Sequence, residues 1–135
     1  MGAAGFRTAA LALLCAGCTS IAADARTFED TRWRVTAINR HVTPAAVNYA
    51  IGFKDGRIGG QFGCNHFGGE YRVAREILTT SAMMMTEMAC PDPAMTFESW
   101  GTAVLQQPMR MTWSSSRRLT LSNDAGSIDL ELLSP

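Results

Sequence analysis

The sequence lacks a surplus of either charge and has few of the residues that bind metals. Its 135 residues include 12 Lys or Arg and 12 Asp or Glu, so the formal net charge is zero. Nucleic-acid-binding domains normally carry a basic surplus, so we expect no nucleic-acid partner. The two histidines, His41 and His66, lie far apart in the sequence. Because a zinc site needs about four ligands, we expect no metal site and no cofactor.

The chain also lacks an apolar run of the roughly 20 residues that a membrane-spanning helix needs. Residues 8–15 are apolar and follow the single charge of Arg7, which is the pattern of an export signal. Ala16-Gly17-Cys18 resembles the end of a bacterial lipobox. Residues 1–17 are therefore predicted to be a lipoprotein-type signal peptide, with Cys18 as the lipidated first residue. Ala23-Asp24-Ala25 offers a later cleavage site, which would give a soluble periplasmic protein instead.

The expected location is the periplasmic side of the outer membrane, with membrane contact by the lipid anchor only. Thr19 favours this location because, by resemblance to proteobacterial lipoproteins, an Asp there would signal inner-membrane retention. Residues 18–27 are small and polar, as in a flexible tether. The remaining residues, 28–135, are enough for one domain, which we expect to be monomeric.

Few cysteines remain once the signal is removed. Cys15 and Cys18 belong to it, which leaves Cys64 and Cys90. Two cysteines in an exported domain are most simply interpreted as one disulfide. Such a bond closes a loop of 27 residues (90 − 64 + 1). The loop-entropy model assigns it roughly 3 to 4 kcal/mol.

From residue 28 onward, apolar and polar residues mostly alternate, which predicts β-strands. Lys54-Asp55-Gly56 predicts a hairpin turn, because glycine accepts the positive φ that such a turn needs. Asn123-Asp124-Ala125-Gly126 predicts another. The alternating apolar sets are Trp33, Val35 and Ala37; Tyr49, Ile51 and Phe53; Met109, Met111 and Trp113; Leu119 and Leu121; and Ile128, Leu130 and Leu132.

One segment, over residues 92–107, has helical spacing instead. Asp92 is predicted to be its N-cap and Pro93 its first residue, and Pro108 follows its end. Its apolar stripe comprises Phe97, Trp100, Val104 and Leu105. Together these patterns predict a mainly β (α+β) fold, in which a small antiparallel barrel-like curved sheet carries one helix.

Two short motifs resemble the META-domain family, which includes the HslJ-like heat-shock lipoproteins of bacteria. The segment 59–71 reads GGQFGCNHFGGEY, and TEMAC, residues 86–90, precedes the predicted helix. The residues that match the two family motifs are Gly63, Cys64, Asn65, Gly69, Tyr71, Thr86, Met88, Ala89 and Cys90. Glu87 stands where the family usually has arginine, which puts any contact of that arginine in doubt. The resemblance implies a small barrel-like fold and an exported stress-associated protein without established catalysis.

No catalytic residue is predicted. Cys64 and His66 share a strand face and could suggest a cysteine hydrolase, but no third catalytic group accompanies them. Asn65 and Tyr71 could line a ligand pocket, although structural roles are favoured for both. Thioethers can bind Cu(I), but Met83 and Met85 would face away from Met84 on a strand, which would divide such a cluster.

The sequence therefore favours a non-enzymatic envelope protein that supports stress tolerance or envelope maintenance by binding another envelope component. That component is either an unknown envelope protein or a small ligand. The first alternative is a carrier that holds a small ligand or copper inside the barrel. The second, less favoured alternative is a cysteine-dependent enzyme.

Overall fold

The computed structural model describes residue 2 and residues 28–134. The predicted signal peptide, the lipidation site Cys18 and the tether 18–27 lie outside the described residues, apart from residue 2. Within the described part, no helix has both the length and the apolar character needed to cross a membrane.

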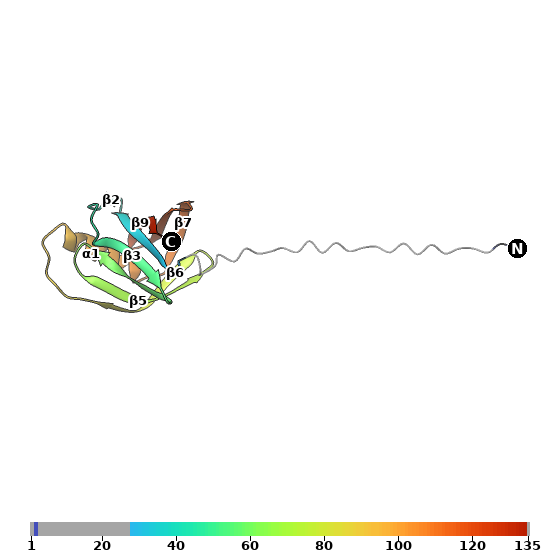
Figure 1. Cartoon of the computed structure of the whole chain (residues 1–135), viewed down its shortest axis with the longest axis horizontal. Helices are drawn as coiled ribbons and strands as arrows, with labels where there is room; N and C mark the ends of the chain where they lie inside the picture. The colour runs from blue at the N-terminus through green and yellow to red at the C-terminus, as the bar shows by residue number, and fades with distance from the viewer. Residues whose placement is uncertain (1, 3–27, 135) are drawn as a thin grey trace.

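Nine strands and one helix make up the described domain, as predicted for a mainly β chain (Figure 1). The strands are β1 (Thr31–Ile38), β2 (His41–Val42), β3 (Tyr49–Lys54), β4 (Arg57–Phe62), β5 (His66–Ala74), β6 (Ile77–Met85), β7 (Met109–Ser115), β8 (Arg118–Asn123) and β9 (Gly126–Ser134). The helix is α1 (Ala94–Leu105).

Eight of the strands form a closed antiparallel barrel. Each of β3 to β9 pairs with its neighbour in chain order, and β1 joins the two ends by pairing with both β3 and β9. The short β2 pairs only with the end of β1, at Ala37 and Ile38. Closure leaves few free edges, which is one way in which a small sheet avoids pairing with other chains.

The two predicted hairpin turns are present. Asp55 and Gly56 both have positive φ, at 53° and 72°, between the paired residues Lys54 and Arg57. This is the backbone that a two-residue hairpin with matching twist requires. At the other turn, Asn123 Oδ1 accepts a hydrogen bond from the Ala125 backbone N–H at 2.9 Å.

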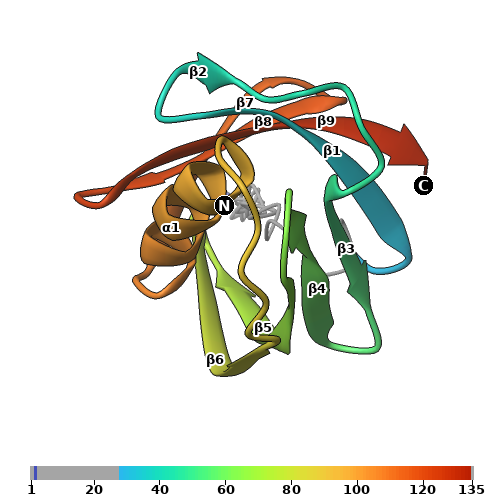
Figure 2. The ribbon, with the colours of Figure 1, turned by 90° about the vertical axis from the view of Figure 1, so that its left-hand side faces the viewer.

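The helix begins and ends two residues inside the predicted range. Pro93, not Asp92, is the N-cap, because its carbonyl accepts the first helical hydrogen bond, from Phe97 N–H at 3.1 Å. Asp92 instead accepts a bond from the Thr96 hydroxyl at 2.9 Å. In Figure 2, α1 lies between β6 and the strands β7 to β9. There β6 and β7 pair only at Ile77 and Leu78, and the helix packs mainly against β9 and β4.

Aromatic and aliphatic side chains fill the barrel interior. The Phe28 ring contacts the rings of Trp33, Phe53, Tyr71 and Trp113, with centroids 4.8 to 6.5 Å apart. Most interior positions predicted from the alternating pattern are buried, including Trp33, whereas Trp113 is 40% exposed. The interior of the barrel is therefore the hydrophobic core of the protein.

Candidate functional site

Asn65 is buried and uses both ends of its side-chain amide. Its Nδ2 donates to Met88 O at 3.0 Å and to Glu98 Oε2 at 2.9 Å. Its Oδ1 accepts from the Thr86 hydroxyl at 3.0 Å and from Met88 N–H at 2.6 Å. These four bonds satisfy every donor and acceptor of the amide. We call these four residues, Asn65, Thr86, Met88 and Glu98, the Asn65 network.

The Asn65 network joins the two sequence motifs to each other and to the helix. Glu98, in the second turn of α1, also accepts the Asn65 backbone N–H at 2.7 Å, so both of its carboxylate oxygens are bonded. Beside the network, the structure contains a disulfide between Cys64 and Cys90, whose Cα atoms are 6.0 Å apart. The motif residues around Asn65 thus hold the segment before the helix against the barrel wall.

Tyr71 anchors the other end of the first motif. Its hydroxyl donates to Glu29 Oε1 at 2.5 Å, and Glu29 also accepts the backbone N–H groups of Asp55 and Gly56 at 2.8 and 2.9 Å. The Tyr71 hydrogen bond, together with the two backbone donors, lowers the pKa of Glu29. Burial, and then the Glu29 carboxylate, raise the pKa of Tyr71 well above its usual value. No local pattern marks Glu29 as a site residue, because its partners lie 26 to 42 residues away.

Two motif glycines also serve the fold. Gly63 has φ +100°, and a Cβ there would lie 2.5 Å from the Tyr49 hydroxyl. A Cβ on Gly69 would overlap the Met83 sulfur. A side chain fits at neither position, so backbone conformation and close packing explain why both residues are glycine.

The structure does not bring the predicted catalytic or metal-binding candidates together. The Cys64 sulfur is in the disulfide, so it offers no thiolate for nucleophilic attack in this state. His41 packs against Trp100 with ring centroids 4.9 Å apart, whereas His66 is exposed on β5. Among the described residues, no group of three or more His, Cys, Asp or Glu could hold a metal ion.

The methionines are divided among different environments. Met109 and Met111 are buried in the core, and Met83 and Met85 pack against it. Met84 and Met88 are exposed. This matches the expectation that Met84 lies on the opposite face of its strand from Met83 and Met85.

An open groove of about 670 Å³ lies on the outer face of β1, β3, β4 and β5. Its floor includes Gly52, Gly59 and Gly68, one from each of three neighbouring strands. Gly59 is the register partner of both Gly52 and Gly68, so the three form a row across the sheet. Each lies between inward-facing residues, which places it on the outer face. We call this hollow the glycine groove.

The fold does not require two of the three glycines in this row. A Cβ on Gly52 would lie 3.8 Å from Thr31 O, and one on Gly68 would lie 3.9 Å from Ile58 O, both ordinary contacts. A Cβ on Gly59 would have less space, because it would lie 3.3 Å from Phe67 O. By contrast, a Cβ on the adjacent Gly60 would overlap the Ala50 carbonyl oxygen. Glycine within a strand often marks a place where a ligand or another chain approaches the backbone closely.

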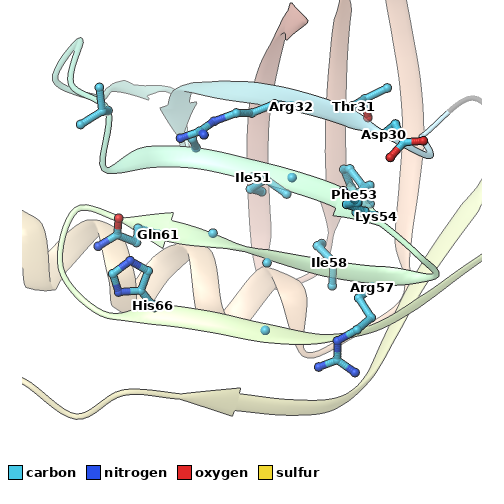
Figure 3. A pocket seen from close by; sticks show the side chains of 16 residues that line it. Asp30, Thr31, Arg32, Ile51, Phe53, Lys54, Arg57, Ile58, Gln61 and His66 are labelled. Atoms are coloured by element: carbon cyan, nitrogen blue, oxygen red, sulfur yellow. The ribbon is translucent and has the colours of Figure 1, made fainter. Parts of the chain in front are cut away.

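Polar and charged side chains border the glycine groove on both sides (Figure 3). Gln61 and His66 are register partners on one side, and Lys54 and Arg57 are register partners on the other. Arg32 is paired with Gly52 and continues the row onto β1. The lining therefore contains three cations and one carboxylate, that of Asp30. Among described residues, none of the three cations is in an ion pair.

The groove is not evident from the sequence, although two of its glycines, Gly59 and Gly68, lie within the first motif. Gly59, Gly60, Gly63, Gly68 and Gly69 all belong to the first motif, and composition does not separate those with a structural role from the rest. The usable signal was strand phase: Gly52 alternates with Ile51 and Phe53, which places it on the outer face.

Comparisons with known proteins identify the family and the fold. The chain matches the META domain over residues 26–132. It resembles a protein structure solved by NMR, with a TM-score of 0.69, 22% identity, and coverage of 79% of this chain and 92% of that one. An NMR structure of a protein from Burkholderia xenovorans gives a TM-score of 0.66 and 18% identity, over 82% of this chain and 86% of that one. No curated protein gives a significant match.

Proposed function

The chain belongs to the META domain family, and from that premise we propose that it acts without catalysis, by binding another component of the bacterial cell envelope through the glycine groove. The observation that carries the proposal is the row of Gly52, Gly59 and Gly68, which leaves an open hollow that the fold itself does not need. None of its three cations is ion-paired with another residue that the structure describes, which gives that hollow a means of recognition.

The proposed location is the periplasmic side of the outer membrane, reached through the predicted signal and held by a lipid on Cys18. The export reading is supported by the apolar segment 8–15 and by the disulfide, since stable disulfides form in oxidising compartments. Binding of this kind would support stress tolerance if it keeps an envelope component in place when stress disturbs protein folding in the envelope.

The carrier alternative has less support. A ligand inside the barrel would need the space that Trp33, Phe53 and Phe62 occupy, each 1% exposed or less. Close-packed interiors resist such insertion. The groove, by contrast, is open to solvent without any rearrangement.

Site-specific photo-cross-linking in cells tests the proposal. A photoreactive residue at Gln61 samples the groove, and one at Thr120 samples the outer face of β8, across the barrel. We expect a discrete cross-linked product from position 61 only, and we expect Gly68→Val to suppress it by filling the groove. Equal products from both positions, or a product from position 61 that survives Gly68→Val, would refute the groove as the binding surface.

A further inference from the structure

The glycine row on the groove floor crosses three neighbouring strands. Neighbouring strands lie about 4.8 Å apart, so Gly52 and Gly68 are separated by about 10 Å across β4. That distance is comparable to the length of two linked sugar rings. With no side chain on the row, the face of a sugar ring can lie directly on the backbone.

The pairing of the strands excludes one common mode of protein recognition here. A peptide that extends a sheet needs a strand with an unpaired edge. Over the row, β3, β4 and β5 each pair on both edges, so their backbone groups are already bonded. A ligand in the groove must therefore lie on the face of the sheet and be recognised through the floor and the bordering side chains.

The lining also disfavours a nucleobase or nucleotide. Bases are held by stacking on exposed aromatic rings. Of the two aromatic rings in the lining, Phe53 points into the core and is 1% exposed, which leaves the single exposed ring of His66 at one border. A ligand for this groove must therefore be recognised mainly by hydrogen bonds and charge.

The charges of the lining indicate an acidic ligand. Arg32, Lys54 and Arg57 are exposed and outnumber the single lining carboxylate of Asp30. Glu70 lies opposite Arg57 in the register, just outside the lining, and reduces but does not cancel this excess. Charge-assisted hydrogen bonds from arginine and lysine to a carboxylate are stronger than neutral ones.

The opposite border suits hydroxyl and amide groups. Gln61 Nε2 donates to Cys64 O at 2.9 Å, so its carbonyl oxygen is the group that it offers to a ligand hydroxyl. His66 is exposed beside it and is not tied by ring packing as His41 is. One border thus offers the cations of Lys54 and Arg57, and the other offers the Gln61 amide and the His66 imidazole.

We infer that the glycine groove binds an acidic amino-sugar glycan of the cell wall, with two sugar rings on the glycine floor and a carboxylate at Arg32, Lys54 or Arg57. The inference rests on the proposed function and names the envelope component that it leaves open. A glycan is inferred instead of a protein because the glycine row crosses the strands, lies where no strand edge is free, and is about two sugars long.

Calorimetric titration of the purified full-length protein with two disaccharides tests this inference. The acidic probe is N-acetylglucosaminyl-N-acetylmuramic acid, and the neutral control is N,N′-diacetylchitobiose, which has a similar sugar frame without the carboxylate. We expect the acidic disaccharide to bind at least about fivefold more tightly, and added salt to weaken its binding. Equal binding of the two, or no binding of either, would overturn the inference.

Variants locate the site. Arg32→Gln with Arg57→Gln should weaken the acidic probe by about tenfold, which corresponds to about 1.4 kcal/mol. The matched control, Arg118→Gln on β8, removes an exposed arginine across the barrel and should leave binding unchanged. Gly68→Val should abolish binding while Gly68→Ala weakens it less, and the melting temperature of each variant shows that it is folded. An equal loss in Arg118→Gln would contradict the assignment.

The failure of this inference can be distinguished from the failure of the proposed function. If neither disaccharide binds but the groove-specific cross-link at position 61 persists, the glycan is wrong and the groove still binds an envelope component. If the cross-link is also absent, both are wrong.

Discussion

The Asn65 network predicts that Asn65→Ala is unusually destabilising for the loss of one polar side chain. The substitution removes four hydrogen bonds at once. It leaves Glu98 Oε2 buried without its donor, and it releases both backbone groups of Met88. A single lost hydrogen bond costs about 1 kcal/mol, and a buried unsatisfied group costs about 1 to 3 kcal/mol.

The magnitude follows from how far water can replace each lost partner. Met88 is 53% exposed, so its backbone groups can regain water and together cost about 1 to 2 kcal/mol. Glu98 is 7% exposed, so water cannot easily replace the donor that its Oε2 loses, and this unsatisfied oxygen costs about 2 kcal/mol. The total is about 3 to 4 kcal/mol. For a domain of this size, that lowers the melting temperature by about 15 °C.

Thermal unfolding followed by near-ultraviolet circular dichroism measures the effect, with Gln61→Ala as the matched control. Gln61 also donates to a backbone carbonyl of the same corner, Cys64 O, and this is its one side-chain hydrogen bond within the described part of the chain. We expect its loss to cost about 1 kcal/mol. If Asn65→Ala melts no lower than Gln61→Ala, then the network does not hold the helix segment to the barrel and the reasoning is wrong.

The remaining predictions concern the disulfide, the glycines, one titrating pair and the anchor. Cys64→Ser with Cys90→Ser should destabilise the oxidised protein by about 3 kcal/mol, measured by urea unfolding; equal midpoints for the variant and the wild type without reductant would exclude a contribution from the bond. Gly60→Ala should cost about 1 to 3 kcal/mol, because its Cβ would overlap Ala50 O, whereas Gly52→Ala and Gly68→Ala should be neutral or slightly stabilising; similar losses in all three would remove the distinction between structural and groove glycines. Because the pKa of Glu29 is lowered in the folded protein, Glu29 contributes to stability above its ordinary pKa of about 4.5, and this contribution is lost as pH falls through the folded value. Because the pKa of Tyr71 is raised, its contribution to stability is lost as pH rises above about 10. Glu29→Gln should therefore flatten the acid side of the stability–pH curve and Tyr71→Phe both sides, and curves parallel to wild type would argue against this pair. Cys18→Ser should move the protein from the membrane fraction to the soluble fraction on cell fractionation, and unchanged membrane association would exclude lipidation as its anchor.

Local patterns were sufficient for most of the secondary structure. The alternation at Trp33 and Val35 and at Ile128 and Leu130 marks strands with one buried face, and these residues are buried as expected. The turn at Asp55 and Gly56 was predictable because few residue pairs adopt positive φ so readily. The helix was predictable from its apolar stripe, although the chemistry of Pro93 did not fix which residue accepts the first helical bond.

Barrel closure and the two motif anchors depended on distant contacts. Nothing in the sequence near Glu29 indicates that it bonds to Tyr71, 42 residues away, or that Glu98 accepts both N–H groups of Asn65. The β1–β9 pairing likewise joins residues about a hundred positions apart. Such contacts form only when the whole chain has folded, because their partners come from segments that are far apart in the sequence.

The strands, their turns, the helix and the family can be predicted from the sequence, because these depend on local spacing and on short motifs. Which glycines the fold needs, and which leave a hollow, depends on the tertiary structure. Gly60 and Gly68 look alike in the sequence, but one faces the carbonyl of a neighbouring strand and the other faces solvent. The register of β3, β4 and β5 makes that difference, and register is a property of the assembled sheet.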